Sequence, residues 1–167
     1  VFMGPCAAKK LEASRRTIRS DVDFVLTFEE LQGMFQAKEV DFATLEPDEQ
    51  DKDFDQGTGA GRGFAVVGGV AAAVADHISK IRPGTEVKME FGDGLRECRK
   101  MLLMAKAGKR NGYLLEGMAC PGGCVAGAGT IAPVAAASAA VKKYKDEAPK
   151  QNAGESSYAA RLSEATE

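Results

Sequence analysis

Two cysteines separated by three residues have the clearest capacity for chemistry in this sequence. Cys120 and Cys124 enclose Pro-Gly-Gly within "GMACPGGCVAGAG", residues 117–129. The proline fixes φ and removes an N–H donor, while the glycines let the backbone curl. We expect the N–H groups of Gly122 and Gly123 to point inward, which would suit an anionic thiolate–sulfide core. The pair is therefore a candidate metal or redox site.

Nearby thiols fit four chemistries: a disulfide, a zinc site, a redox dithiol or an iron–sulfur cluster. The spacing is neither the two-residue spacing of thioredoxin-like dithiols nor the usual zinc-ribbon spacing. Four cysteines in 167 residues, with no visible export signal, do not make a disulfide framework. A buried turn with incidental cysteines is the remaining alternative, so the rest of the chain has to decide.

Cys6 is the second candidate ligand. It follows Pro5 in "FMGPCAAKKLEA", at the expected end of a strand and before a helix-forming run. Such a position lies in the crevice at the carboxyl end of a sheet, where α/β proteins place cofactors. Lys9 and Lys10 follow one turn later and would bring positive charge near an anionic site. Taken alone, the segment also fits a buried cysteine with two solvated lysines.

Other residues of reactive type are assigned structural roles. Cys98 falls on the apolar face of its expected helix with Leu95 and Leu102, so we expect it to pack in the core. His77 lies beside an aliphatic stripe and is expected at its boundary rather than in a metal site. The methionines are treated as core residues, except Met118, which flanks the cysteine loop.

The elements that must position these residues alternate between strand and helix. We expect strands at 22–27, 86–91 and 112–118, helices from residue 28 and over 64–82, 95–105 and 125–144, and an acidic surface loop at 46–57. Thr27 and Glu30 form an expected capping box at the start of the first of these helices. Two buried stripes are expected, formed by Phe28, Leu31, Met34 and Phe35 and by Val70, Val74, Ile78 and Ile81. This order predicts an α/β layer structure.

Composition excludes several classes of protein. Charged residues make up 28% and hydrophobic residues 44% of the chain, and the formal net charge is −2. These values favour neither nucleic acid nor a membrane as partner, and no apolar run approaches the roughly 20 residues of a bilayer span. Since the chain opens on Val1 without a methionine or a signal peptide, we expect a piece of a longer cytoplasmic protein, cut inside its fold.

The two cysteine segments together resemble the iron-only hydrogenases. "PCAAKKLE" is similar to the second cysteine signature of that family, and "EGMACPGGCVAGAG" to the third. The resemblance implies one lobe of a two-lobed domain, with an about four-stranded, mostly parallel sheet flanked by helices. Residues 1–145 would form this lobe, incomplete at its N-terminus, and residues 146–167 a linker and a weak terminal helix.

The resemblance also implies a cofactor, a 4Fe–4S cluster joined through one cysteine to a di-iron subcluster that carries CO and cyanide. Cys6 and Cys120 match ligands of the 4Fe–4S cubane, and Cys124 matches the cysteine shared with the di-iron unit. Lys9 matches the lysine that hydrogen-bonds an iron-bound cyanide, in keeping with the strength of ammonium donors. Glu12 lies one helical turn on, placed to pair with Lys9 or hold a water.

Two further residues and three departures complete the resemblance. Met118 and Phe64 match residues that line the di-iron pocket. The first cysteine signature is absent, so the chain alone cannot supply four cubane ligands. Gly4 stands where the catalytic enzymes have methionine, as in the hydrogen-sensing subgroup. The glycine-rich tail has Ala128 and Thr130 where catalytic members commonly carry glycine and glutamine.

The implied function is reversible oxidation of H₂ and reduction of protons in anaerobic hydrogen metabolism, or the sensing of H₂. The implied partners are H₂ and protons, the missing N-terminal part of the domain, and an electron carrier such as ferredoxin or an NAD-linked subunit. A hydrogenase-like structural or assembly iron–sulfur protein without a di-iron unit is the alternative, and a zinc domain is a third. We expect the isolated chain to be free of metal and inactive.

Overall fold

The fold combines short parallel strands with helices. A computed structural model describes residues 1–15, 17, 21–46, 48 and 57–159. The helices are α1 (Ala8–Ser14), α2 (Phe28–Ala37), α4 (Gly59–Arg62), α5 (Gly69–Ile81), α6 (Leu95–Lys106) and α7 (Val134–Asp146). The strands are β1 (Phe2–Met3), β2 (Val25–Leu26), β3 (Lys88–Asp93) and β4 (Tyr113–Met118), and the 3₁₀ turns are η1 (Gly63–Ala65), η2 (Cys124–Ala126) and η3 (Ala153–Glu155).

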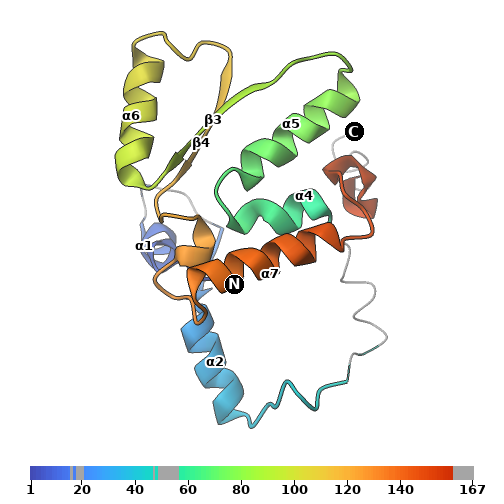
Figure 1. Cartoon of the computed structure of the whole chain (residues 1–167). Coiled ribbons are helices and arrows are strands. Elements are labelled where there is room, and N and C mark those ends of the chain that lie inside the picture. The colour runs from blue at the N-terminus through green and yellow to red at the C-terminus, as the bar shows by residue number, and fades with distance from the viewer. Residues whose placement is uncertain (16, 18–20, 47, 49–56, 160–167) are drawn as a thin grey trace.

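The strands form two parallel pairs. β1 pairs with β2 in the register Phe2–Val25, and β3 pairs with β4 from Lys88–Tyr113 onward. The α/β class is confirmed, but the expected single sheet of about four strands is wrong, since the described strands fall into two separate two-stranded sheets (Figure 1). Pro5 helps to end β1 so early, because a proline has no N–H to continue the ladder.

Helix α2 confirms one expectation and contradicts another. Its capping box is present, since the Glu30 amide donates to Thr27 Oγ1 (3.2 Å) and the Thr27 amide donates to a Glu30 carboxylate oxygen (2.8 Å). The expected buried stripe is wrong, because no residue of α2 is buried and Phe28 and Met34 are exposed. Figure 1 shows the reason, as α2 extends away from the layer formed by α4, α5 and α7.

The acidic side of this cap is sensitive to pH. The Lys10 ammonium and the Thr27 amide lower the pKa of the Glu30 carboxyl below its usual range. The ionised Glu30 carboxylate therefore stabilises the folded state at pH values above its pKa in the unfolded chain. This stabilisation is lost as the pH falls through the lower pKa that Glu30 has in the folded state. We expect Glu30→Gln to lower the urea midpoint at pH 7 and to leave it nearly unchanged at pH 3. An equal loss at both pH values would contradict this account.

Helix α5 is shorter than the stretch 64–82 and does not bury the expected stripe. Gly68 has φ +82°, a left-handed conformation that separates η1 from α5. The residues that α5 buries are Ala71 and Ala73, whereas Val74 and Ile81 of the expected stripe are exposed. Helix α5 packs against both α4 and β4, and its two buried residues, which lie on different sides of the helix, are alanines.

Helix α6 lies close to its expected position and packs on β3 and β4. The face that it turns toward the sheet is not the expected one. Met101 is buried and Cys98 half-buried against the sheet, whereas Leu95 and Leu102 are 73% and 60% exposed. Cys98 packs against the sheet, since a Cβ on Gly92 or Gly117 would lie 3.0 or 3.2 Å from its sulfur, and its thiol donates to the carbonyls of Gly92 (3.3 Å) and Met118 (3.5 Å). The expectation of a buried leucine stripe beside it is wrong.

The C-terminal third is more irregular than a helix over 125–144. η2 is followed by non-helical backbone, and α7 begins only at Val134, after Pro133 at its N-cap. Residues 148–155, expected to be part of a linker, are packed onto the fold: Ala148 is buried, and the Asn152 side chain, 1% exposed, lies between Asp76 and His77. The division of the chain near residue 145 stays a prediction.

Three stretches lie partly or wholly outside the described residues. These are the expected acidic loop at 46–57, residues 16 and 18–20 before β2, and the part of the expected terminal helix beyond residue 159. Among the helices that are described, none is long and apolar enough to cross a lipid bilayer.

Candidate functional site

The cysteine turn between β4 and η2 is held by a hydrogen bond to Asp93 and by one within its own backbone. Gly122 and Gly123 have φ +95° and +100°, a conformation that glycine adopts without strain. The Gly122 amide donates to Asp93 Oδ1 (2.6 Å) at the end of β3, and the Gly123 amide donates to the Cys120 carbonyl (2.9 Å). The expectation that both amides point inward toward a cluster is therefore wrong, because the protein itself occupies them.

Segments far apart in sequence approach this turn closely. A Cβ on Gly123 would lie 2.7 Å from the Ala65 carbonyl oxygen, so the backbone after η1 presses against the turn. A Cβ on Gly127 would lie 2.3 Å from the Pro5 carbonyl oxygen, and that oxygen accepts a hydrogen bond from the Gly129 amide (2.9 Å). These contacts bring the loop of Cys6 beside the loop of Cys124.

The Gly127 contact makes a testable prediction. Gly127→Ala would place a methyl group too close to the Pro5 carbonyl oxygen and push the two cysteine loops apart. We therefore expect a loss of about 2 kcal/mol in the free energy of unfolding. Gly33→Ala is the matched control, since nothing lies within 4 Å of its Cβ position in α2. The control should gain about 0.5–1 kcal/mol. Urea denaturation measures both, and equal effects would contradict the close approach.

Electrostatic coupling links the cysteines of the two loops. Burial raises the pKa of the Cys124 thiol, and the nearby thiols of Cys6 and Cys120 raise it further. The Lys9 ammonium opposes these effects and lowers the same pKa. Such mutual influence requires the groups to lie in one neighbourhood. The thiols of Cys6 and Cys120 and the Lys9 ammonium therefore lie near enough to Cys124 to act on its ionisation.

Lys9 is paired within its own helix. Its ammonium donates to both carboxylate oxygens of Glu12, at 2.9 and 2.7 Å. This hydrogen bond is the main cause that raises the pKa of Lys9, and Cys6 and Cys124 add to it. Lys10 does not add its charge to the site as expected, because its ammonium donates instead to Glu30 and to the Val25 carbonyl.

The two residues that match a di-iron pocket lie on the segments that bound the cysteine turn. Met118 is half-buried at the end of β4, two residues before Cys120. Phe64 lies in η1, which packs against η2, and its side chain is exposed. His77 lies away from the thiols, with Nδ1 3.1 Å from Asn152 Oδ1, as expected for a boundary residue.

A buried carboxylate was missed by sequence reasoning. Glu116 is 8% exposed and accepts hydrogen bonds from the amides of Gly68 (2.7 Å) and Ala71 (2.6 Å) at the start of α5. It fixes α5 to β4, four residues before Cys120. The available signal was an acidic residue inside the apolar strand "GYLLEGM", because a charge buried there needs partners.

The donor set fits an iron–sulfur cluster in part. Cys6, Cys120 and Cys124 are free thiols, each half-buried, and thiolates are the ligands that such clusters use. Within the described ranges, no three His, Cys, Asp or Glu side chains converge closely enough to hold a single metal ion. A cluster of several irons is larger than one ion and accepts thiols that stand farther apart.

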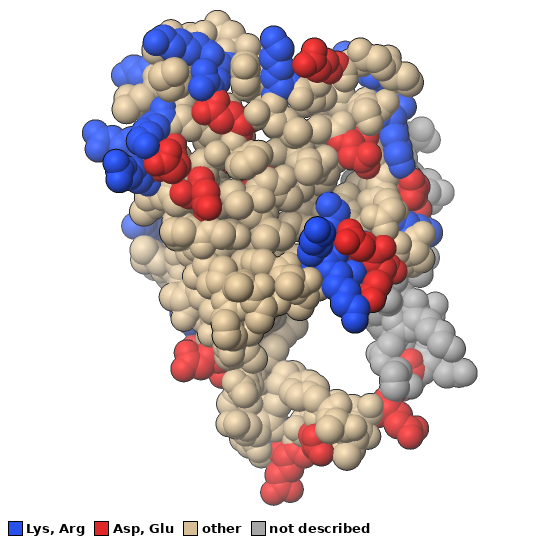
Figure 2. Space-filling view, in the orientation of Figure 1, with Lys and Arg blue, Asp and Glu red and all other residues tan. Residues whose placement is uncertain are grey.

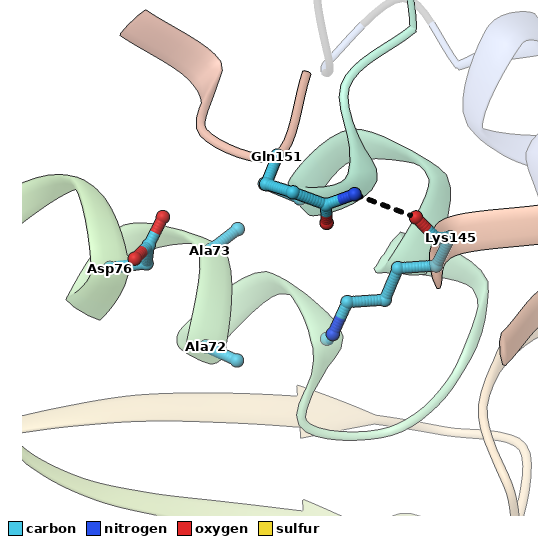
Figure 3. Close-up of a pocket in the computed structure, with 7 residues that line it drawn as sticks. Ala72, Ala73, Asp76, Lys145 and Gln151 are labelled. Atoms are coloured by element: carbon cyan, nitrogen blue, oxygen red, sulfur yellow. Dashed lines mark hydrogen bonds between the residues drawn. The ribbon is translucent and has the colours of Figure 1, made fainter. Parts of the chain in front are cut away.

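A separate hollow of about 290 Å³ lies between α4, α5 and the end of α7 (Figure 3). Its lining consists of Ala60, Gly69, Ala72, Ala73, Asp76, Lys145 and Gln151. Asp76 and Lys145 come from different helices and lie on opposite sides of it. Because no thiol lines this hollow, it is distinct from the cysteine site.

Comparison with known proteins identifies the family. The family model described as "Iron only hydrogenase large subunit, C-terminal domain" matches residues 1–128. A periplasmic [Fe] hydrogenase large subunit of Nitratidesulfovibrio vulgaris is 32% identical over an alignment that covers 77% of this chain and 38% of that protein. A probable cytosolic Fe–S cluster assembly factor of Drosophila virilis is 28% identical, with 77% of this chain and 35% of that protein covered.

The fold is similar to that of a solved hydrogenase. The structure of a variant of the [FeFe]-hydrogenase HydA1 from Chlamydomonas reinhardtii matches with a TM-score of 0.66 and 21% identity, covering 97% of this chain and 57% of that one. The chain thus spans between a third and three fifths of the length of these proteins. It belongs to the family of the iron-only hydrogenase large subunit, C-terminal domain.

Proposed function

We propose that this chain forms one wall of the H-cluster site of an iron-only hydrogenase, which oxidises H₂ or reduces protons. The observation that carries the proposal is the close approach of the loop after β1, which holds Cys6, to the loop after β4, which holds Cys120 and Cys124, through the contacts of Pro5 with Gly127 and Gly129. The Lys9 ammonium lies near enough to lower the pKa of the Cys124 thiol. Both loops leave the carboxyl ends of parallel strands, the position where α/β proteins bind cofactors.

The thiols have distinct proposed roles. Cys6 and Cys120 would hold the 4Fe–4S cubane, and Cys124 would be the thiolate shared with the di-iron subcluster. The bound cluster supplies the iron chemistry that splits or forms H₂. The fourth cubane ligand comes from the missing N-terminal part of the same domain. The protein's contribution is the rigid turn around Gly122 and Gly127, which fixes the positions of the thiols.

Lys9 and Glu12 act on the ligands and protons of the site. The Lys9 ammonium donates a hydrogen bond to an anionic ligand of the di-iron unit, and Glu12 holds Lys9 in its charged form and in position. Met118 and Phe64 border the pocket and limit the access of water. The partners of the whole protein are H₂, protons and an electron carrier such as ferredoxin or an NAD-linked subunit, and its compartment is the cytoplasm.

Fe–S assembly without a di-iron unit is the second candidate function, favoured by the similarity to the Drosophila assembly factor. A cubane without a di-iron unit has no cyanide ligand to which a lysine could donate, so the presence of Lys9 favours the hydrogenase. Infrared spectroscopy of the matured full-length protein distinguishes the two. Bands of iron-bound CO and cyanide are expected for the hydrogenase, and a cubane signal without these bands would establish the alternative.

A sensing role is a variant of the hydrogenase proposal and depends on Gly4. A Cβ on Gly4 would lie 2.9 Å from atoms of the Phe2 ring, so Phe2 occupies the space that a methionine would need. The test therefore introduces the methionine together with a smaller residue at position 2 and compares Phe2→Ala/Gly4→Met with Phe2→Ala. We expect faster H₂ turnover in the double variant, and equal rates would remove Gly4 as a determinant.

Iron analysis of the isolated chain tests the ligand assignment. With three of four cubane ligands, the purified chain should contain little iron after anaerobic reconstitution. Iron approaching four atoms per chain would contradict the assignment of the fourth ligand to a missing segment.

A further inference from the structure

The hollow between α4, α5 and the end of α7 has a charged side chain at each end and small apolar residues between them. Its volume of about 290 Å³ is close to the lower end of ligand pockets, which measure roughly 300–1,000 Å³. In Figure 3, Ala72 and Ala73 lie between Asp76 on one side and Lys145 on the other. A ligand in the hollow would therefore meet a charge at each end and methyl groups along its length.

The cation of the hollow is half-buried and lacks a counter-ion. The ammonium of Lys145 makes no hydrogen bond or ion pair with any residue that the structure describes. Its aliphatic stem lies over η1, since a Cβ on Gly63 would lie 3.2 Å from Lys145 Cδ. A cation that is partly removed from water gains from an anionic partner. The Lys145 end of the hollow therefore suits a carboxylate.

The carboxylate of the hollow is held in place by a buried amide. The side chain of Asn152, which is 1% exposed, donates a hydrogen bond to Asp76 Oδ2. Asp76 Oδ1 accepts no hydrogen bond from the residues that the structure describes. One oxygen of Asp76 is thus fixed by the fold, and the other is available to an ammonium group. This arrangement needs little reorganisation when a ligand binds.

The separation of the two charges limits the length of the ligand. Gly63 touches the start of α5, since a Cβ on Gly69 would lie 2.0 Å from the Gly63 carbonyl oxygen, so the stem of Lys145 lies at that end of α5. Asp76 lies seven residues further along α5, or roughly 10 Å. Hydrogen bonds of about 2.8 Å at both ends leave about 4–5 Å between the charged groups of the ligand.

The surface around the hollow does not favour one sign of charge. Figure 2 shows Lys and Arg next to Asp and Glu over the C-terminal end of α7. The exposed residues there include Lys142, Lys143, Asp146 and Glu147. A ligand with one positive and one negative group fits such a surface better than a ligand with a single charge.

We propose that this hollow binds a small zwitterion in which a short aliphatic chain separates a carboxylate from an ammonium group. The carboxylate accepts from Lys145, the ammonium donates to Asp76, and the aliphatic chain contacts Ala72 and Ala73. The inference is independent of the proposed function, because no thiol lines the hollow and binding requires no cluster.

An NMR titration of the full ¹⁵N-labelled chain with 4-aminobutanoate tests the site, since this molecule in its extended form has about the required length. The backbone amides of Gly69, Ala72 and Ala73 should shift. Butanoate and butylamine each lack one charge and should bind at least about fivefold more weakly, because each loses a charged hydrogen bond. Equal binding of butanoate would show an anion site, and equal binding of butylamine a cation site. Either result, or no shift with 4-aminobutanoate, would overturn the proposal.

Lys145→Met assigns the carboxylate end, because methionine keeps an unbranched stem over Gly63 but has no charge. This variant should bind 4-aminobutanoate at least about fivefold more weakly and butylamine within about twofold of the unmodified chain. Lys142→Met is the matched control, since Lys142 is exposed on α7 and does not line the hollow. Equal effects of the two substitutions on 4-aminobutanoate would contradict a specific contact with Lys145.

Ala72→Leu tests the location without removing a charge. Ala72 is exposed on α5 and lines the hollow, so a leucine there should fill part of the space and weaken the binding of 4-aminobutanoate at least about fivefold. The urea midpoint should stay nearly unchanged, because leucine is a good helix former. An unchanged affinity in a folded Ala72→Leu variant would show that the zwitterion binds elsewhere and would overturn the proposal.

Discussion

Cys124→Ser in the matured full-length protein is expected to abolish the infrared bands of iron-bound CO and cyanide. Cys124 is the thiolate proposed to join the cubane to the di-iron unit. Its burial and the nearby thiols of Cys6 and Cys120 raise its pKa. Changes to residues that only support metal ligands cost roughly 10–100-fold in affinity, so loss of the shared ligand should exceed about a hundredfold in H₂ turnover.

Cys98→Ser is the matched control for this loss. Cys98 is the fourth cysteine of the chain, and its thiol donates to the backbone carbonyls of Gly92 and Met118. The control should retain the bands, because a serine hydroxyl can donate to the same carbonyls. If both variants lose the bands, the loss reports general misfolding, and if both keep them, Cys124 is not a ligand.

Glu116→Ala should have the largest effect on stability, a loss of about 2–4 kcal/mol in the free energy of unfolding. Its carboxylate accepts from two amides at the start of α5, and the alanine would leave these donors without a partner in a buried setting. Glu116→Gln keeps one acceptor oxygen and should lose about half as much. The measurement is urea denaturation followed by circular dichroism.

Glu97→Ala is the control for Glu116→Ala. Glu97 is exposed on α6 and forms an ion pair with exposed Lys100, so its removal should change the free energy of unfolding by less than about 0.5 kcal/mol. A similar change in Glu116→Ala would mean that the buried carboxylate does not hold α5 to β4.

Local patterns predicted the elements around the site well. Alternating polar and apolar residues located β3, and a short apolar stretch located β4, to within about two residues. Thr27 with Glu30 located the start of α2, because a capping box is a local signal. The proximity of the Cys6 and Cys124 loops could not come from local patterns, since it depends on backbone contacts such as Gly127 with Pro5. Only the resemblance to a family predicted it.

The expectations that failed depend on what covers each element. The helical spacing of apolar residues predicted that the leucines of α6 and the apolar residues of α2 lie in a core. Several of these side chains are exposed. Small residues proved better markers of close packing, since Ala71 and Ala73 rather than the larger aliphatics are buried on α5. The prediction that the Gly122 N–H points toward a cluster was wrong, because this N–H donates to the Asp93 carboxylate. Nothing in the sequence around Asp93 marked it as the partner of this turn.

Cross-linking of the reduced chain with a short bismaleimide, followed by mass spectrometry of its peptides, tests most directly whether the three thiols share one neighbourhood. We expect Cys6 to be linked to Cys120 or Cys124 and not to Cys98, with the yield falling in Gly127→Ala. Links between Cys120 and Cys124 together with a Cys6 that reacts only singly, or that links to Cys98, would contradict the shared site.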